Sequence, residues 1–159
     1  MSTTILYCSS NREKPDFEAR VVDSLLAVSD GLPIVSVTQK PMQLGRNICV
    51  GDVGASGFNY FKQILVELRE IDTDYVMSAE ADCLYPQGFF QYIPPRADVC
   101  YRATQVYVMP DARDFFFLKR EGSTLGQIVG LNYYRSTLEA LFEGLHGHFD
   151  LATACIMRN

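Results

Sequence analysis

A predominantly apolar run over residues 75–79 ends in two carboxylates, Glu80 and Asp82, which are separated by the small residue Ala81. The length and apolar character of the run predict a strand that is buried on both faces. Because unpaired charges are costly to bury, the two acids are expected to emerge at the carboxyl edge of a sheet, where ligands of open α/β folds bind.

Glu80 and Asp82 are expected to point to the same side, because side chains alternate along a strand with a period of two. Ala81 leaves room for a ligand to approach. Two neighbouring oxygen ligands with open space around them suit a hard divalent cation that also needs phosphate oxygens. The same acidic pair is compatible with a helix cap or a solvated turn, so both interpretations stay open at this point.

The composition is that of an ordinary globular domain. The chain has 159 residues, of which 48% are hydrophobic and 21% charged, so one domain with a sizeable core is expected. A net charge of -5 argues against a general nucleic-acid binder, which usually carries a basic stripe. No apolar run approaches the roughly 18 residues that a membrane span needs, and the first residues do not resemble a signal peptide. A cytoplasmic protein is therefore expected.

The five cysteines are widely spaced and include no CxxC pair, so the sequence indicates neither a zinc site nor redox chemistry. They are interpreted as small buried residues. Cys83 lies beside the acidic pair, but no basic residue adjoins it in the sequence. It is therefore not predicted to be a nucleophile.

The chain begins with a β-α-β pattern, which implies parallel strands joined by a crossover. Residues 3–8 predict a first strand, a helix begins at Pro15 and stops at Asp30 and Gly31, and residues 34–37 predict a second strand. The apolar face predicted for the helix consists of Phe17, Val21, Val22, Leu25, Leu26 and Val28.

Residues 40–57 form a long, glycine-rich connection, and connections of this length usually have a function or are mobile. Backbone amides freed by glycines such as Gly54, just before a helix, predict a cradle for a diphosphate. The pattern is neither Walker A nor GxGxxG, so a flexible connection capped by Ser56 is the alternative interpretation. The apolar stripe predicted for the following helix is Phe58, Phe61, Ile64, Leu65 and Leu68.

The second half of the chain predicts short strands over residues 99–101, 106–109 and 115–118, followed by a helix over residues 132–145. The three phenylalanines at 115–117 are interpreted as core residues rather than as a stacking platform. Together the elements predict a single α/β domain with a mostly parallel central sheet flanked by helices. Short antiparallel strands are expected in its C-terminal half.

The order of these parts resembles the glycosyltransferase A fold, in particular family 2-like nucleotide-diphospho-sugar transferases. The segments that carry the resemblance are VGASGFNYFKQI, YVMSAEAD and GQIVGLNYYRSTLEALFEGL. The last is similar to the family's small-residue strand and aromatic-arginine helix on the acceptor side. The resemblance covers most of the chain and implies a Rossmann-like nucleotide-binding half over residues 1–85 and an acceptor-side half over residues 86–159.

The resemblance also implies roles for individual residues. Asp82 would ligate Mn2+ or Mg2+ on the donor diphosphate, with Glu80 as the supporting acid. The family often has an aspartate at the position of Gln39, so base specificity is not predicted. The residues implied along the nucleotide-sugar wall are Ser9, Asn11, Arg12, Gln39, Gly54, Ser56, Asn59, Lys62, Glu80 and Ala81.

The sequence departs from the family pattern near its end, because the later acidic pair has no clear counterpart before Asn159. Asp150 or His148 would substitute as the base that takes a proton from the acceptor hydroxyl, and His146 as an added metal ligand. An exposed histidine without a role is the alternative for each histidine. The chain is also compatible with a reduced member, a fragment, or a protein completed by a homo-oligomer or a partner chain.

Three functions follow from these patterns. The first is metal-dependent transfer of a sugar from a nucleotide-diphosphate donor to an unidentified acceptor hydroxyl. The second is a sugar-phosphate nucleotidyltransferase, which would normally show a glycine-rich loop with a basic residue after the first strand, whereas residues 9–13 contain no glycine. The third is a non-catalytic nucleotide-sugar binding module, which the missing late acids favour.

Overall fold

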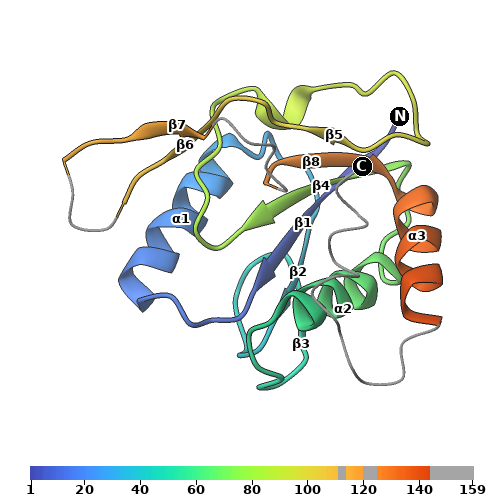
Figure 1. Ribbon diagram of the computed structural model, residues 1–159, viewed down its shortest axis with the longest axis horizontal. Coiled ribbons are helices and arrows are strands. Elements are labelled where there is room, and N and C mark those ends of the chain that lie inside the picture. Colours follow the sequence, from blue (N-terminus) through green and yellow to red (C-terminus); the bar gives the residue numbers. More distant parts are fainter. Residues whose placement is uncertain (111–113, 120–124, 144–159) are drawn as a thin grey trace.

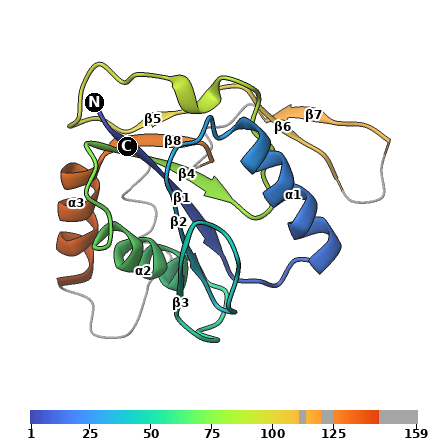
Figure 2. The same ribbon diagram turned by 180° about the vertical axis from the view of Figure 1, so that it is seen from behind.

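The computed structural model describes residues 1–110, 114–119 and 125–143 of the chain. Within them, six strands form one sheet in the order β3-β2-β1-β4-β8-β5, and β6 and β7 form a separate hairpin. Helix α1 (Pro15–Val28) covers one face of the sheet, and α2 (Gly57–Leu68) and α3 (Leu131–Glu143) cover the other (Figures 1 and 2). The predicted single α/β domain with a mostly parallel sheet is confirmed.

The first four strands of the sheet run parallel: β1 (Thr3–Ser9), β2 (Ile34–Thr38), β3 (Arg46–Cys49) and β4 (Tyr75–Glu80). The sheet is completed by β8 (Gln127–Gly130), antiparallel to β4, and by β5 (Tyr101–Arg102), antiparallel to β8. The chain builds outward from β1 through β2 and β3 on one side and through β4 on the other. The order therefore reverses between β1 and β4, and their carboxyl ends form the switch point where ligands of such folds bind.

The two core layers follow from alternation along β1 and β4. Leu6 and Val76 pack under α2 and α3, whereas Ile5 and Met77 pack on the side of α1. The predicted strand over residues 75–79 is buried at every position, as its apolar character requires. This rigid pair of central strands carries the candidate site at its carboxyl end.

Strand β3 was not predicted, because residues 40–57 read as one long connection. Its sequence RNIC has no apolar alternation, and its residues are exposed or half-buried at the edge of the sheet. Asn47 fixes the strand instead: its side-chain amide donates to the hydroxyls of Ser36 and Thr38, both at 2.9 Å. Tertiary hydrogen bonds, rather than a local pattern, make this strand.

Helix α1 buries most of the face predicted for it, including Val21 and Leu25, but not all of its members. Phe17 and Leu26 are exposed, while the carboxylate residue Glu18 is buried beside Val21 and Leu25. Glu18 is tolerated there because the hydroxyls of Tyr7 and Ser9 donate to its Oε1 at 3.0 and 2.5 Å.

The C-terminal strands are also displaced from the prediction. β5 begins at Tyr101 rather than at residue 99, and the hairpin strands are β6 (Val106–Val108) and β7 (Phe117–Lys119). The prediction that residues 115–117 are core is wrong, because these phenylalanines are exposed. The prediction of buried cysteines fails at Cys49, which is exposed. Helix α3 begins at Leu131, and its predicted end at residue 145 lies outside the described residues.

None of the helices in the described part of the chain combines the length and the apolar character that crossing a membrane requires.

Candidate functional site

A cavity of about 200 Å³ opens at the carboxyl ends of β1 and β4, at the switch point of the sheet. This volume is below the roughly 300–1,000 Å³ of pockets that enclose a whole drug-sized ligand, so a nucleotide would lie partly outside it. The cavity is lined by Cys8, Ser9, Ser10, Glu13, Gln39, Gly54, Ala55, Ser56, Tyr60, Gln63, Glu80, Ala81 and Asp82.

The acidic pair sits on a turn that the backbone holds in place. Glu80 is the last residue of β4, and its amide donates to the hydroxyl of Tyr85 at 3.1 Å. The amide of Cys83 closes the turn by donating to the carbonyl of Glu80 at 3.2 Å. Asp82 lies in this turn rather than on the strand, so strand alternation does not place it, but both acids line the cavity.

The Glu80 carboxylate is the half-buried member of the pair, and Asp82 is the exposed one. Burial, assisted by the neighbouring charge of Asp82, raises the pKa of Glu80 to about 7. The hydroxyl of Tyr60 donates to Glu80 Oε1 at 3.2 Å, which partly offsets that rise. A cation beside the pair would favour the ionised carboxylates.

The electrostatic character of the cavity is negative. Its lining includes the acids Glu13, Glu80 and Asp82 and, among the described residues, neither lysine nor arginine. None of the ion pairs found in the described ranges involves Glu80 or Asp82. Among the described residues, no basic side chain therefore forms an ion pair with these acids, and both remain available to a cation.

The residues present fit a divalent cation. One ligand atom from each of Glu80, Asp82 and Cys83 lies within 4.8 Å of the others. The two carboxylates are the hard oxygen ligands that Mn2+ and Mg2+ accept. Burial, followed by the charge of Asp82, raises the pKa of the Cys83 thiol, which therefore stays protonated and is not an activated nucleophile.

The glycine-rich loop contributes Gly54, Ala55 and Ser56 to the cavity lining. Gly54 has a φ of +80°, a conformation that a side chain would strain, and its amide donates to Asp52 Oδ1 at 3.2 Å. Because this amide already donates to Asp52, it is not free to bind a phosphate. The predicted diphosphate cradle is therefore not formed at Gly54. The electropositive feature of this part of the lining is the N-terminus of α2, where Ser56 accepts from the Asn59 amide at 3.1 Å.

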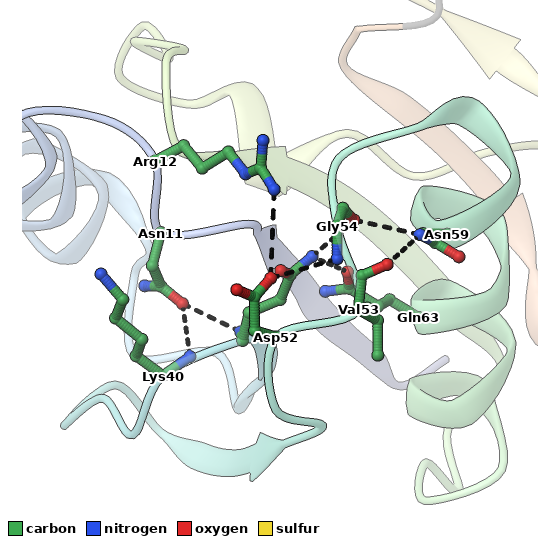
Figure 3. A network of polar contacts seen from close by, with 9 residues as sticks. Asn11, Arg12, Lys40, Asp52, Val53, Gly54, Asn59 and Gln63 are labelled. Atoms are coloured by element: carbon green, nitrogen blue, oxygen red, sulfur yellow. Dashed lines mark hydrogen bonds and ion pairs between the residues drawn. The ribbon is translucent and has the colours of Figure 1, made fainter.

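A network of amide side chains ties the loops around the cavity together (Figure 3). Asn11 Oδ1 accepts from the backbone amides of Gln39 and Lys40 at 2.9 and 2.8 Å. Gln39 Nε2 donates to the carbonyl of Gly54 and to Gln63 Oε1, both at 3.0 Å. These bonds fix the ends of β1 and β2 against the loop before α2, so the wall of the cavity is preorganised.

Of the residues predicted from the nucleotide-sugar resemblance, Ser9, Gln39, Gly54, Ser56, Glu80, Ala81 and Asp82 line one cavity. The Ser9 hydroxyl, however, is engaged by Glu18. Arg12 lies outside the lining and approaches Asp52 at 3.9 Å. Lys62 is exposed, with Nζ 5.8 Å from the centre of the Phe58 ring.

Asn11 and Asn59 are brought near the cavity but do not line it. Asn59 Nδ2 donates to the carbonyls of Val53 and Gly54, so both asparagines hold loops in place. Asp150, His148 and His146 lie outside the described residues. Arg135, in the helix that resembles the acceptor side, instead donates to the carbonyls of Leu68 and Ile71.

Sequence reasoning missed Tyr60 and Gln63, which form the α2 side of the cavity. A usable signal existed: Tyr60, Gln63 and Glu67 recur at helical spacing beside the apolar stripe, where Gln63 and Glu67 are buried. It also missed Glu13, in the loop after β1, for which the sequence holds no specific signal.

No protein-family model matches the sequence, and no curated protein matches it. Solved structures with the same fold include bifunctional IspDF from Campylobacter jejuni, with a TM-score of 0.58 and 14% identity over 99% of this chain and 47% of that one. CMP:2-keto-3-deoxy-manno-octonic acid synthetase complexed with CTP aligns with a TM-score of 0.54 and 12% identity, over 99% of this chain and 84% of that one.

The apo form of the glycosyltransferase GlyE from Streptococcus pneumoniae TIGR4 aligns with a TM-score of 0.52 and 11% identity, over 99% of this chain and 42% of that one. This chain thus spans less than half the length of IspDF and of GlyE. At such low identity the likeness establishes a fold shared by a glycosyltransferase and a CTP-bound synthetase. The choice of reaction then depends on the site.

Proposed function

We propose that the chain binds a nucleoside diphosphate sugar together with Mn2+ or Mg2+ and transfers the sugar to an acceptor hydroxyl. The observation that carries this proposal is that Glu80 and Asp82 line the same cavity as Gly54 and Ser56. A diphosphate in that cavity would lie near both the carboxylate pair and the N-terminus of α2, whose dipole favours a negative group.

The charge of the cavity supports a ligand that arrives with a cation. Glu13, Glu80 and Asp82 would repel a bare diphosphate, because the described lining supplies no lysine or arginine. A divalent cation held by Glu80 and Asp82 would remove that repulsion. When bound, it would also stabilise the charge that develops on the departing nucleoside diphosphate.

The chain's own residues would hold and orient the donor. The Tyr60 hydroxyl holds the Glu80 carboxylate and the turn closed by Cys83 holds its backbone, so little reorganisation would be needed on binding. Gln39 and Gln63 would supply a rigid polar wall at the ends of β1 and β2. The base that accepts the proton from the acceptor hydroxyl stays a prediction, with Asp150 and His148 as the candidates.

A sugar-phosphate nucleotidyltransferase is the second candidate. The observation that favours it is the shared fold with the CTP-bound synthetase, of which this chain covers 84% of the length. The absence of lysine and arginine from the described lining is less suited to this reaction, because a triphosphate carries more negative charge than a diphosphate. Pyrophosphate release from nucleoside triphosphates in the presence of sugar phosphates would identify this activity.

The proposal is tested by calorimetry with UDP, GDP, ADP and CDP, each with and without Mn2+. We expect one or more nucleotides to bind only with the metal, and Asp82→Asn to weaken that binding at least about 10-fold through the lost ligand. Asp72→Asn, which changes an exposed acid near the opposite end of β4, is the matched control. Unchanged affinity in Asp82→Asn would contradict the role of Asp82.

Hydrolysis of the matching nucleotide sugar then separates an enzyme from a binding module. Donor hydrolysis that requires Mn2+ and is lost in Asp82→Asn would support transfer to an acceptor. Metal-dependent binding without turnover in the presence of saccharide, lipid or protein acceptors would favour the non-catalytic module instead.

A further inference from the structure

The hairpin of β6 and β7 lies outside the central sheet, in the connection between β5 and β8. In both ribbon views its strands extend outward past α1, away from the body of the molecule (Figures 1 and 2). Its register pairs Val106 with Lys119, Tyr107 with Leu118 and Val108 with Phe117. In the described part of the chain, these two strands pair only with each other.

One face of this hairpin carries four exposed, large hydrophobic side chains. Tyr107 and Leu118 are paired across the strands and therefore share a face, and the Tyr107 ring contacts the Phe116 ring with centroids 5.5 Å apart. Met109 joins them by alternation along the chain. The exposed fractions are 56% for Tyr107, 68% for Met109, 65% for Phe116 and 45% for Leu118. We name these four residues the hairpin face.

The hairpin face is larger than ordinary scattered surface hydrophobics. With about 200 Å² for each large side chain, these fractions leave on the order of 500 Å² of apolar surface in one patch, and patches of that size usually mark interaction sites. A two-stranded hairpin is also marginally stable by itself in water. Both considerations indicate that this face is covered in the working protein.

We infer that the hairpin face packs against the hairpin face of a second copy of this chain, related by a two-fold axis. Two such faces together would bury at most about 900 Å², an area typical of a weak, reversible contact rather than of a permanent dimer. An apolar face with a central aromatic pair is its own complement, as an isologous contact requires. Leu118 and Phe116 would pack against Tyr107 and Met109 of the other copy.

The charge of the hairpin face favours a second copy of the chain over a lipid surface. Membrane-binding faces combine apolar side chains with lysines or arginines that meet anionic headgroups. None of the four hairpin-face residues is basic, and Lys119, which alternates with Leu118, points to the opposite face. The net charge of -5 would add repulsion from an anionic membrane.

Sedimentation equilibrium over roughly 1–100 µM protein tests the inference. We expect the wild-type chain to sediment at twice its 17.9 kDa mass at the upper concentrations. Phe116→Asp is expected to raise the dimer dissociation constant at least about 10-fold, because it places a charge at the centre of an apolar contact. The matched control is Tyr133→Asp, an aromatic of 44% exposure on α3, which should change that constant less than about twofold.

Thermal melting followed by circular dichroism checks that each variant is folded. If Phe116→Asp does not melt cooperatively, Met109→Asp is used in its place. A wild-type chain that sediments at the single-chain mass at every concentration overturns the inference. So does a dimer that Phe116→Asp and Met109→Asp leave intact. A monomer that cosediments with vesicles of phosphatidylcholine and phosphatidylserine would assign the face to a membrane instead.

Discussion

At the scale of single residues, Glu67 is the least expected feature of the core. Its side chain is fully buried on α2, and neither carboxylate oxygen has a well-formed hydrogen bond among the described residues. Burial raises the pKa of Glu67 well above its usual value, and the nearby backbone of Tyr7 offsets only part of that rise. A carboxyl group in this position is held in its neutral form.

Glu67 therefore makes stability depend on pH. The folded chain keeps the Glu67 proton to a higher pH than the unfolded chain, whose glutamate titrates near 4.5. The free energy of unfolding should thus fall as the pH rises above that value. We expect Glu67→Met to raise it by about 1–3 kcal/mol at pH 8 and to have a smaller effect at pH 5, since the unsatisfied carboxyl is removed.

Urea denaturation at pH 5 and pH 8 measures this effect. Glu80 also titrates with a raised pKa, so the comparison with wild type isolates the contribution of Glu67. Glu143→Gln, which changes an exposed carboxylate at the end of α3, is the control. A Glu67→Met variant whose stability changes with pH in parallel with the wild type would show that Glu67 is not the titrating group.

At the scale of elements, the N-terminus of α2 joins folding to the site. Ser56 caps the helix through its bond to the Asn59 amide, and the same residue lines the cavity. In the sequence, a cap at Ser56 was the alternative interpretation to a diphosphate cradle, and the structure contains this cap. The dipole of the helix then acts where the proposed diphosphate would lie.

Substitutions of Ser56 separate the two roles. Ser56→Ala should lower the free energy of unfolding by about 1 kcal/mol, because the cap is lost. Ser56→Asp should keep that stability, since aspartate also caps helices, but should weaken metal-dependent nucleotide binding at least about 10-fold through charge repulsion with the phosphates. Urea denaturation and calorimetry measure the two effects. Equal nucleotide affinity in Ser56→Asp and wild type would place the phosphates elsewhere.

Local sequence patterns predicted the elements whose own hydrophobic residues are periodic. They failed where contacts with distant segments determine the structure. The strand predicted over residues 75–79 extends one residue further, to Glu80, and the helix after Ser56 contains the whole predicted apolar stripe. β3 was missed because Asn47, not an apolar alternation, holds it to β2. The hairpin phenylalanines were misread as core because hydrophobicity reports the tendency to be buried, not the presence of a covering surface.

At the scale of the whole molecule, Arg135 connects two helices that are far apart in sequence. Its guanidinium donates to the carbonyls of Leu68 at 2.7 Å and of Ile71 at 3.2 Å, just where α2 ends. These bonds satisfy carbonyls that a helix end leaves without partners. Arg135 thus contributes to the packing of α3, rather than facing the cavity at the other end of the sheet.

Arg135→Met should therefore lower stability without affecting the site. We expect a loss of about 1.5–3 kcal/mol in the free energy of unfolding, the range for hydrogen bonds to charged groups, and no change in metal-dependent nucleotide affinity. Arg20→Met, which removes an exposed arginine of α1, should cost less than about 0.5 kcal/mol. Denaturant unfolding and calorimetry provide the measurements. A loss of nucleotide affinity in the folded Arg135→Met variant would contradict the structural role.

The sequence by itself determined the α/β class, the start of the chain as β1, α1 and β2, and the place of the acids after β4, because hydrophobic period and charge are local properties. Only the tertiary structure decided that Tyr60 and Gln63 meet those acids, since α2 and β4 are different elements that packing brings together. It also decided that the Gly54 amide is occupied by Asp52 and that the hairpin face is uncovered. Contacts between distant segments depend on packing, which no local period encodes.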